Sequence, residues 1–441
     1  MNTKSNTQPA RSKFSILKQI CNLIPPHLVP KLARETGVDK RARAFSPWSH
    51  VVSLMYSQLA HCLSLNDVCD GLSLHGGPLS TLRGATPPNR NTLSHANKVR
   101  SWELAQRLFY RMLDHLQSSS PNFFDAHGNR RFARRFKRTI HVVDATTIQL
   151  VANSMDWAKH RRRKAAAKCH MRRDLQSFLP RFAIVDTAKE NDNKRAREVC
   201  ADIRDGEIVV FDKAYVDFAH LADLSARGVS WVTRAKDNMK YRVERKIQHG
   251  VQGAILRDDL IRLKNKKSRK DYPELMRRIV ARVEVDGRMQ EMEFLTNNLV
   301  WSANSVADLY RSRWSIEVFF KQLKQTLQLG DFLGHNANAV KLQVWTALLV
   351  YVLLRYLHGV HTWAHSFARL FTVLRSSLWR CWNLKSLLQC YGTAGGHLRM
   401  LGVPEQAFLP GFVRRPVGQP APRIDAPPTG GDERKNSETA I

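Results

Sequence analysis

The chain has few cysteines for its 441 residues, and their spacing follows no pattern. The seven cysteines are scattered and odd in number, and no two of them form a CxxC pair. This argues against a disulfide framework and against a zinc ribbon. A reducing cytoplasm is the compartment that such cysteine usage predicts.

The sequence also lacks a hydrophobic run long enough to cross a bilayer. Its most apolar segment, residues 346–357, is too short to span a membrane and contains Arg355, so we expect a buried helix. The first twelve residues are polar and lack the apolar run of a secretion signal. The protein is therefore expected to have no membrane partner.

Acidic residues are scarce relative to basic ones. The chain has 38 Asp and Glu against 70 Lys and Arg, which gives a formal net charge of +32. This excess predicts a polyanionic partner, and it favours nucleic acid over a membrane surface. A ribosome-associated or merely basic protein is the alternative that charge alone leaves open.

The first 125 residues read as a helical domain. Ser46, as a helix cap before Pro47, marks one helix start, and Gly76, Gly77 and Pro78 interrupt the pattern. The polar residues of 90–98 suit a DNA groove, although a plain helical bundle explains each helix equally well. Apolar periodicity predicts helices at about residues 14–23, 46–63, 89–100 and 101–117.

Beyond residue 139 the pattern changes to that of an α/β domain. Strands are expected at 140–150, 179–187 and 207–211, with helix-like stretches between them, followed by helices at about 306–329 and 338–357. The expected boundaries are 1–125 for a helical DNA-binding domain, 139–235 for the first part of the α/β core, 236–298 for a β-rich insertion, 299–360 for the second part of the core, 361–402 for a C-terminal helical region and 403–441 for a disordered tail.

Two carboxylates occupy unusual places in the expected strands. Asp144 is at the centre of the apolar strand HVVDATT, and Asp212 follows the strand IVVF. A carboxylate at such a position costs free energy unless something uses it, and a divalent cation is the natural use. Asp174 and Asp186 look similar, so acid spacing alone is a poor guide.

A third carboxylate lies on the helix expected at 306–329, which Ser305 and Asp308 would start as a capping box. With Asp144 and Asp212, this Glu317 would supply oxygen ligands for two Mg²⁺ ions, the arrangement used in phosphodiester chemistry. The alternative is a solvated helix face with an Arg–Glu pair. At about 100° per residue, one face of the helix carries a phenol, two cations and the carboxylate: Tyr310, Arg313, Glu317 and Lys324.

The spacing Y-x2-R-x3-E-x6-K, from Tyr310 to Lys324, resembles the YREK signature of the insertion-sequence-four family of DDE transposases. Asp144-Ala-Thr resembles the family's first aspartate motif, residues 212–215 (DKAY) its second, and residues 294–297 (FLTN) the strand before the YREK helix. The helical N-terminal region also looks like the domain that precedes this core in one branch of the family.

The resemblance implies a ribonuclease-H-like catalytic core with a β-rich insertion, preceded by an all-helical N-terminal domain. It implies cut-and-paste transposition, with Asp144, Asp212 and Glu317 as catalytic metal ligands for two Mg²⁺ ions and with Mn²⁺ as a substitute. The implied partners are the inverted-repeat ends of the protein's own element, target double-stranded DNA and a second copy of the chain on DNA. The implied location is the bacterial cytoplasm, at the nucleoid when DNA is bound.

The resemblance also assigns the other residues of the signature. Tyr310, Arg313 and Lys324 are expected to grip DNA phosphates near the scissile bond, which suits a phenol and two cations beside a metal-binding carboxylate. The chain departs from some relatives at Met292, where they place a Trp that stacks on a flipped base. Base flipping through this position is therefore not expected.

Two basic clusters complete the sequence pattern. Residues 159–173 hold eight Lys and Arg, and residues 262–270 hold six. A charge run is usually a solvated face, but beside a site that cuts phosphodiesters DNA contact is favoured. In the first cluster we expect three arginines to contact DNA: Arg161, Arg162 and Arg163.

Two other functions remain open at this point. One is a non-mobile nuclease on the same fold, and the other is a catalytically silent DNA-binding protein derived from a transposase. The complete set of carboxylates and signature residues argues against the silent protein. Family likeness alone separates a transposase from a nuclease.

Overall fold

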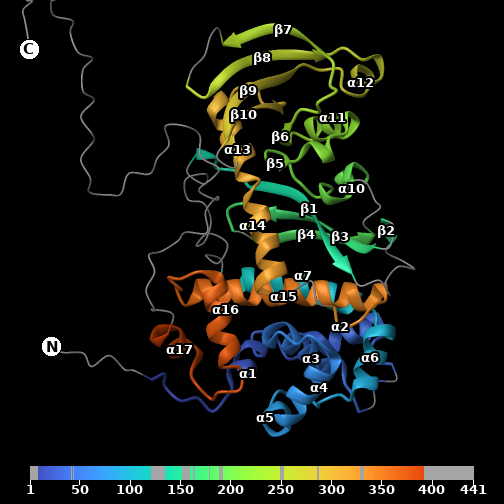
Figure 1. Ribbon diagram of the computed structural model, residues 1–441, viewed down its shortest axis with the longest axis vertical. Coiled ribbons are helices and arrows are strands. Elements are labelled where there is room, and N and C mark those ends of the chain that lie inside the picture. The colour runs from blue at the N-terminus through green and yellow to red at the C-terminus, as the bar shows by residue number, and fades with distance from the viewer. Residues whose placement is uncertain are drawn as a thin grey trace, which may run out of the picture.

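The protein forms a tall mixed sheet above a layer of helices, as the computed structural model shows (Figure 1). The expected tail at 403–441 and two of the expected DNA contacts, Arg162 and Arg163, lie outside the described residues. The structure describes residues 8–40, 42, 44–120, 135–150, 159–161, 164–177, 179–187, 192–248, 253–285, 288–327 and 332–391.

The N-terminal part of the helical layer follows local sequence signals closely. Ser46 caps α3 and Asn89 caps α6, each side chain accepting a backbone N–H of the first turn. The break predicted around 76–78 is present, because α4 ends at Leu74 and His75 separates it from the short α5, whose first turn accommodates Pro78 without losing a hydrogen bond. The helices are α1 (Ile16–Cys21), α2 (Leu28–Thr36), α3 (Pro47–Ala60), α4 (Leu65–Leu74), α5 (Gly76–Ser80), α6 (Arg90–Val99) and α7 (Glu103–Ser119).

The sheet has the order β2-β3-β1-β5-β6-β10-β9-β8-β7, with β4 paired to β3. β1 is parallel to β5 and β5 to β6, whereas the other pairs are antiparallel. The order β4-β3-β1-β5-β6 is that of the expected ribonuclease-H-like core, so the α/β prediction is confirmed. The strands are β1 (Ile140–Leu150), β2 (Lys159–Arg161), β3 (Lys164–Asp174), β4 (Pro180–Thr187), β5 (Ile208–Phe211), β6 (Ser230–Arg234), β7 (Tyr241–Gln248), β8 (Ile255–Leu263), β9 (Met276–Val285) and β10 (Arg288–Thr296).

The helix-like stretch predicted between β1 and β4 is wrong, because these residues form the strand β3. Its sequence, KAAAKCHMRRD, is rich in residues that favour helices, but β1 and β4 pair with it on both sides and satisfy its backbone. Arg172 and Arg173, which belong to the first basic cluster, are 2% and 1% exposed. These two arginines are therefore part of the protein core and lie out of reach of DNA.

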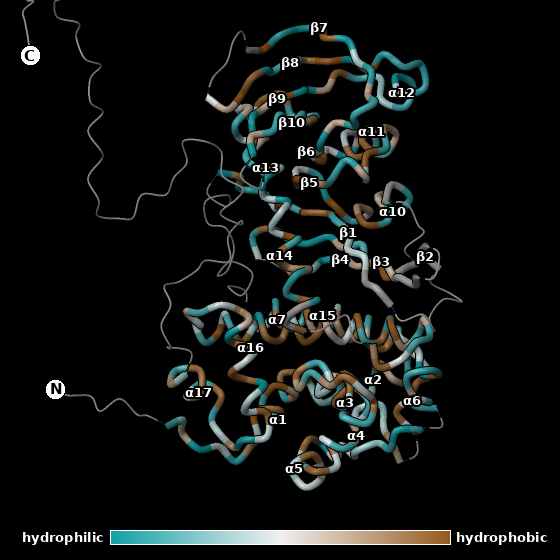
Figure 2. The backbone as a smooth tube through the Cα atoms, viewed as in Figure 1, coloured by the Kyte–Doolittle hydropathy of each residue, from teal (hydrophilic) through white to brown (hydrophobic). Residues whose placement is uncertain are grey.

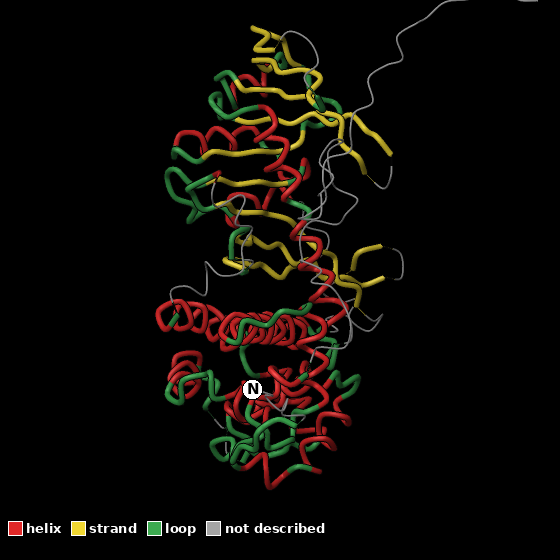
Figure 3. The backbone as a smooth tube through the Cα atoms, turned by 90° about the vertical axis from the view of Figure 1, so that its left-hand side faces the viewer, coloured by secondary structure: helices red, strands yellow, loops and turns green. Residues whose placement is uncertain are grey.

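Helices cover both faces of the sheet (Figure 3). On one face, α10 (Asp192–Val199), η3 (Lys213–Tyr215) and α11 (Phe218–Ala226) enclose one apolar core, and α12 (Lys266–Asp271) packs beside α11. On the other face, α13 (Ala303–Ser312), α14 (Ser315–Lys321) and the π turn η4 (Gln322–Thr326) run from the sheet down to the helical layer (Figure 1).

The helix predicted at 306–329 is therefore wrong in its start and in its continuity. Ser302 caps α13 and accepts the backbone N–H of Ser305, whereas Asp308 pairs with arginine side chains instead of closing a capping box. Two consecutive i→i+3 bonds, from the N–H groups of Arg313 and Trp314, end α13 and separate it from α14. The segment is thus two short helices followed by a π turn.

The helical layer is completed by α15 (Ala337–Val360), α16 (Phe367–Ser376) and α17 (Leu384–Cys390). α15 packs against α7 and α3, and Figure 2 shows it as one of the most apolar elements. Among the described helices it is the one long and apolar enough to cross a membrane, but 83% of its apolar window is buried inside the protein. The prediction of a buried helix is confirmed, although the helix is longer than residues 346–357.

Candidate active site

Two of the expected catalytic carboxylates lie side by side on the sheet. Val143 of β1 is paired with Phe211 of β5, and Asp144 and Asp212 each come one residue later. Neighbouring strands are about 4.8 Å apart, and successive side chains alternate between the two faces. Both carboxylates therefore share the face that α13 and α14 cover.

A guanidinium group links the first carboxylate to the third. Nη1 of Arg313 donates to Oδ2 of Asp144 at 2.5 Å, and Nη2 donates to Oε1 of Glu317 at 3.1 Å. The Arg313 side chain is 9% exposed and that of Asp144 17%, whereas that of Glu317 is 56% exposed. The site is thus closed on the sheet side and open towards solvent at Glu317.

The second carboxylate has a phenol partner. The hydroxyl of Tyr310, on α13, donates to Oδ1 of Asp212 at 3.1 Å, and its ring packs against Phe294 of β10. Burial raises the pKa of the Tyr310 phenol, and the Asp212 carboxylate acts in the same direction. The phenol therefore stays protonated at neutral pH and donates to Asp212.

The π turn brings Lys324 back to the sheet. Its Nζ donates to the carbonyl oxygen of Thr147 on β1 at 2.7 Å. Burial lowers the pKa of the Lys324 ammonium group. The four residues of the predicted signature are therefore assembled around the same two strands, β1 and β5, although their helix is broken twice.

The electrostatic balance of the site is unfavourable to ionised Asp144. Burial raises the pKa of its carboxyl group from 3.8 to about 6, and the neighbouring Asp212 and Glu317 carboxylates add to this, while Arg313 opposes it. Burial also lowers the pKa of Arg313, but the acidic groups around it, Asp144 first among them, more than offset this and raise its pKa overall. The site thus holds an excess of negative charge that a cation would relieve.

The donor set fits a hard divalent cation, because three carboxylates offer only oxygen ligands. Within the described part of the chain, no three acidic, histidine or cysteine side chains close on one point. Arg313 lies between Asp144 and Glu317 and offsets part of their negative charge.

The remaining sequence-predicted residues have other surroundings. Arg161 lies on the short strand β2, and the second basic cluster spans the end of β8 and α12. Asp174, the acid of similar appearance, is buried and accepts backbone N–H groups and Arg181. Met292 lies buried in β10.

Sequence reasoning missed one cation at this edge of the sheet. Arg234 is the last residue of β6, next to Asp212, and is half-buried. A strand that ends in an arginine was visible in the sequence, but its place beside Asp212 depends on the register of β5 and β6.

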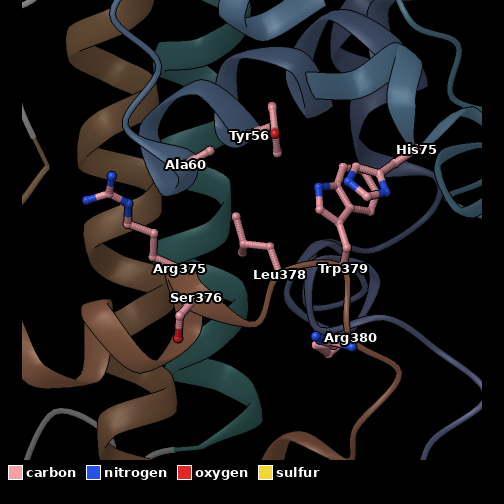
Figure 4. A pocket seen from close by; sticks show the side chains of 8 residues that line it. All are labelled: Tyr56, Ala60, His75, Arg375, Ser376, Leu378, Trp379 and Arg380. Carbon is pink, nitrogen blue, oxygen red and sulfur yellow. The ribbon is translucent and has the colours of Figure 1, made fainter. Parts of the chain in front are cut away.

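A pocket of about 450 Å³ lies elsewhere, in the helical layer between α3 and the end of α16 (Figure 4). In it the ring of His75 stacks on Trp379 at 4.4 Å, with Arg375 and Arg380 at the rim. None of the residues that line it is a carboxylate. The carboxylate site is therefore separate from this pocket.

Comparisons with known proteins agree with the strand order. Residues 135–353 match the family model described as Transposase DDE domain, and residues 12–82 match one described as a domain of unknown function, DUF4372. The transposase family catalyses DNA cleavage and strand transfer, and it generally depends on divalent metal.

Several relatives are bacterial proteins. The transposase-type protein y4zB of Sinorhizobium fredii is 32% identical over 231 residues, which cover 52% of this chain and 63% of that protein. The transposase assigned to insertion sequence element IS5377 of Geobacillus stearothermophilus is 25% identical, over 76% of this chain and 84% of its own. The transposase InsG for insertion sequence element IS4 of Escherichia coli is 27% identical, over 43% and 42%.

Among solved structures, a piggyBac transposase synaptic complex with hairpin DNA is similar at 10% identity, over 89% of this chain and 86% of that one, with a TM-score of 0.40. The strand order, the matched domain and the bacterial relatives agree: the chain carries a transposase DDE domain over residues 135–353 and is similar to transposases of insertion sequences, that of IS4 among them.

Proposed function

We propose that this protein carries out cut-and-paste transposition of an insertion sequence, cutting DNA at the ends of its own element and joining these ends to target DNA. The observation that carries the proposal is that Asp144 and Asp212 lie side by side on one face of the sheet, while Arg313 contacts both Asp144 and Glu317. Burial of the Asp144 carboxylate costs free energy, which a bound cation would offset.

Asp144, Asp212 and Glu317 would hold the metal, for which we propose two Mg²⁺ ions with Mn²⁺ as a substitute. When bound, such ions make a nucleophile of water or a 3′-hydroxyl and stabilise charge on the leaving oxygen. Asp144 and Asp212 are held by adjacent strands, so their spacing is fixed before DNA arrives. Glu317 is exposed on α14, where it faces the side that DNA would approach.

The other signature residues would hold DNA near the scissile bond. Arg313 carries positive charge into the carboxylate site, Lys324 brings a second cation to β1 at Thr147, and Tyr310 donates its hydroxyl to Asp212. Without these groups the carboxylates would repel a phosphate backbone. We therefore propose that Tyr310, Arg313 and Lys324 offset this repulsion and position the phosphates.

The partner would be double-stranded DNA, first the inverted repeats of the element and then the target. The helical N-terminal region would bind the repeats, and two copies of the chain would assemble on DNA because two ends must be processed together. We propose the bacterial cytoplasm as the location, with the protein at the nucleoid when it is bound to DNA. Additional DNA contacts are proposed for three arginines: Arg161, Arg162 and Arg163.

The test of the catalytic assignment is a set of alanine variants on end DNA. Asp144→Ala, Asp212→Ala and Glu317→Ala should each reduce cleavage to background, while binding measured in EDTA stays within about threefold of wild type. Asp186→Asn, a change at an acid of similar sequence context, is the control and should cut normally.

Near-wild-type cutting in Mg²⁺ by any of the three alanine variants would remove that residue from the proposed site. The products separate the alternatives. Ends joined to target DNA support a transposase, cut but unjoined ends indicate a nuclease, and binding without cutting indicates a silent DNA-binding protein.

A further inference from the structure

A cation with no assigned role lies in the same row as the catalytic carboxylates. Val143, Phe211 and Thr233 are paired across the three parallel strands β1, β5 and β6. One residue further along each strand come Asp144, Asp212 and Arg234. Since neighbouring strands are about 4.8 Å apart, Arg234 follows Asp212 directly in this row.

The side chain of Arg234 is on the face where DNA chemistry is proposed. It follows the same alternation as Val232, which packs in the core that α13 and α14 share with Val142 and Val210. The charge of Arg234 also acts on the phenol of Tyr310, where it opposes the increase in pKa that burial causes. Arg234 is thus close to the Tyr310–Asp212 pair.

Arg234 differs from the other polar groups of the site because its guanidinium makes no hydrogen bond or ion pair among the described residues, although its charge acts on Tyr310 and on the exposed Asp237. Arg313 is engaged by two carboxylates, and Tyr310 and Lys324 each donate to an acceptor. Lys213, next to Asp212, donates to an exposed aspartate, Asp237. A half-buried guanidinium has lost part of its hydration shell. Its unused N–H donors therefore favour a ligand that satisfies them better than the remaining water does.

We propose that Arg234 binds a backbone phosphate of the DNA end, next to the scissile bond and on the Asp212 side of the carboxylates. A planar guanidinium donates two parallel hydrogen bonds to a phosphate, and partial burial strengthens them. Arg313 serves the Asp144–Glu317 side, so Arg234 gives the opposite side of the site a cation of its own. This inference rests on the proposed function, because it takes end DNA as the ligand.

The first measurement is equilibrium binding of pre-cut end DNA in EDTA at several salt concentrations. Each phosphate contact contributes about 0.9 to the slope of log K against log salt, so Arg234→Ala and Arg234→Gln should each lower the slope by about one. Affinity near 0.15 M salt should fall by about tenfold. Arg234→Lys, which keeps the charge, should restore the slope, and circular dichroism should show that all variants fold.

Lys385→Ala is the matched control, since it removes one exposed positive charge from α17 in the helical layer. Its slope should fall by less than half as much. The second measurement places single uncharged methylphosphonate linkages along the end DNA. One linkage beside the scissile bond should weaken wild-type binding and cause no further loss with Arg234→Ala.

An unchanged slope, together with methylphosphonate penalties that simply add to the mutation at every position, would overturn the phosphate contact. Failure of the proposed function gives a different result. If the wild-type protein failed to cut end DNA in Mg²⁺, the proposed transposase activity would be refuted. A lower salt slope in EDTA, together with one methylphosphonate position that causes no further loss with Arg234→Ala, would still support Arg234 as the phosphate ligand.

Discussion

Replacing Asp144 with asparagine should stabilise the metal-free protein at neutral pH while abolishing cleavage. The folded pKa of Asp144 is about 6 against 3.8 in the unfolded chain, so the fold favours the protonated carboxyl group. Its contribution to stability is therefore fully present below about pH 4 and is lost as pH rises through about 6. A difference of about two pKa units corresponds to roughly 3 kcal/mol at about 1.36 kcal/mol per unit, which Asp144→Asn would avoid.

The assay is chemical denaturation of wild type and Asp144→Asn in EDTA between pH 4 and 7.5. The free energy of unfolding of the variant should be nearly equal to that of the wild type at pH 4 and should exceed it by about 3 kcal/mol above pH 6.5. Asp114→Asn, a change at an exposed site on α7, is the control and should show no comparable trend. A wild type that is the more stable protein at pH 7, or a difference that is the same at every pH, would refute this reasoning.

Three further substitutions test the surroundings of the carboxylates. Lys324→Ala should impair end cleavage much more than Lys321→Ala, because Lys324 reaches the backbone of β1 whereas Lys321 is exposed; equal defects in parallel cleavage assays would contradict this. Tyr310→Phe should slow cleavage by about tenfold and lower the melting temperature slightly, because the ring keeps its packing while the hydrogen bond to Asp212 is lost. Wild-type cleavage would argue against that role. Arg173→Met should change the melting temperature and leave the salt slope of DNA binding unchanged, because the guanidinium of Arg173 is buried. A lower slope would indicate that Arg173 contacts DNA.

Much of the core fold could be predicted because its signals are local. Residues 140–150 were predicted as a strand and form β1, and residues 207–211 contain β5. Their apolar, β-branched pattern determines both the structure and the burial of each strand. Asp144 and Asp212 stand out for the same reason, since each interrupts or ends such a pattern, although their catalytic role stays a prediction.

The strand β3 could not be predicted because its stability comes from its neighbours. An alanine-rich and lysine-containing sequence favours a helix locally, whereas pairing with β1 and β4 is a long-range effect. The burial of the charged Arg173 could not be predicted either, because it also depends on a distant partner. Its Nη2 donates to Oγ of Ser315 at 2.5 Å, a partner 142 residues away.

The helical segment that carries Arg313 and Glu317 was predicted by face and spacing but not by continuity. Helical geometry placed Arg313 and Glu317 four residues apart on one face, and the structure keeps them in contact. The break before α14 and the π turn after it involve long-range partners such as Arg355, which donates to Gln322. Arg234 was missed because the register of parallel strands is set by the whole sheet.

The packing of both ends of the chain into one helical layer has a consequence for synthesis. α7 ends at Ser119, but its packing partner α15 ends at Val360, so a further 241 residues must be made after α7 before α15 is complete. At about 5–20 residues per second, the ribosome needs roughly 12–48 s to make that segment. The backbone pairing of Arg11 with Trp382 is completed later still. The apolar faces of the first helices are therefore exposed in the nascent chain. We expect a chaperone that binds such faces to raise the yield of folded protein. This increase should be larger than for a chain whose N-terminal domain folds alone.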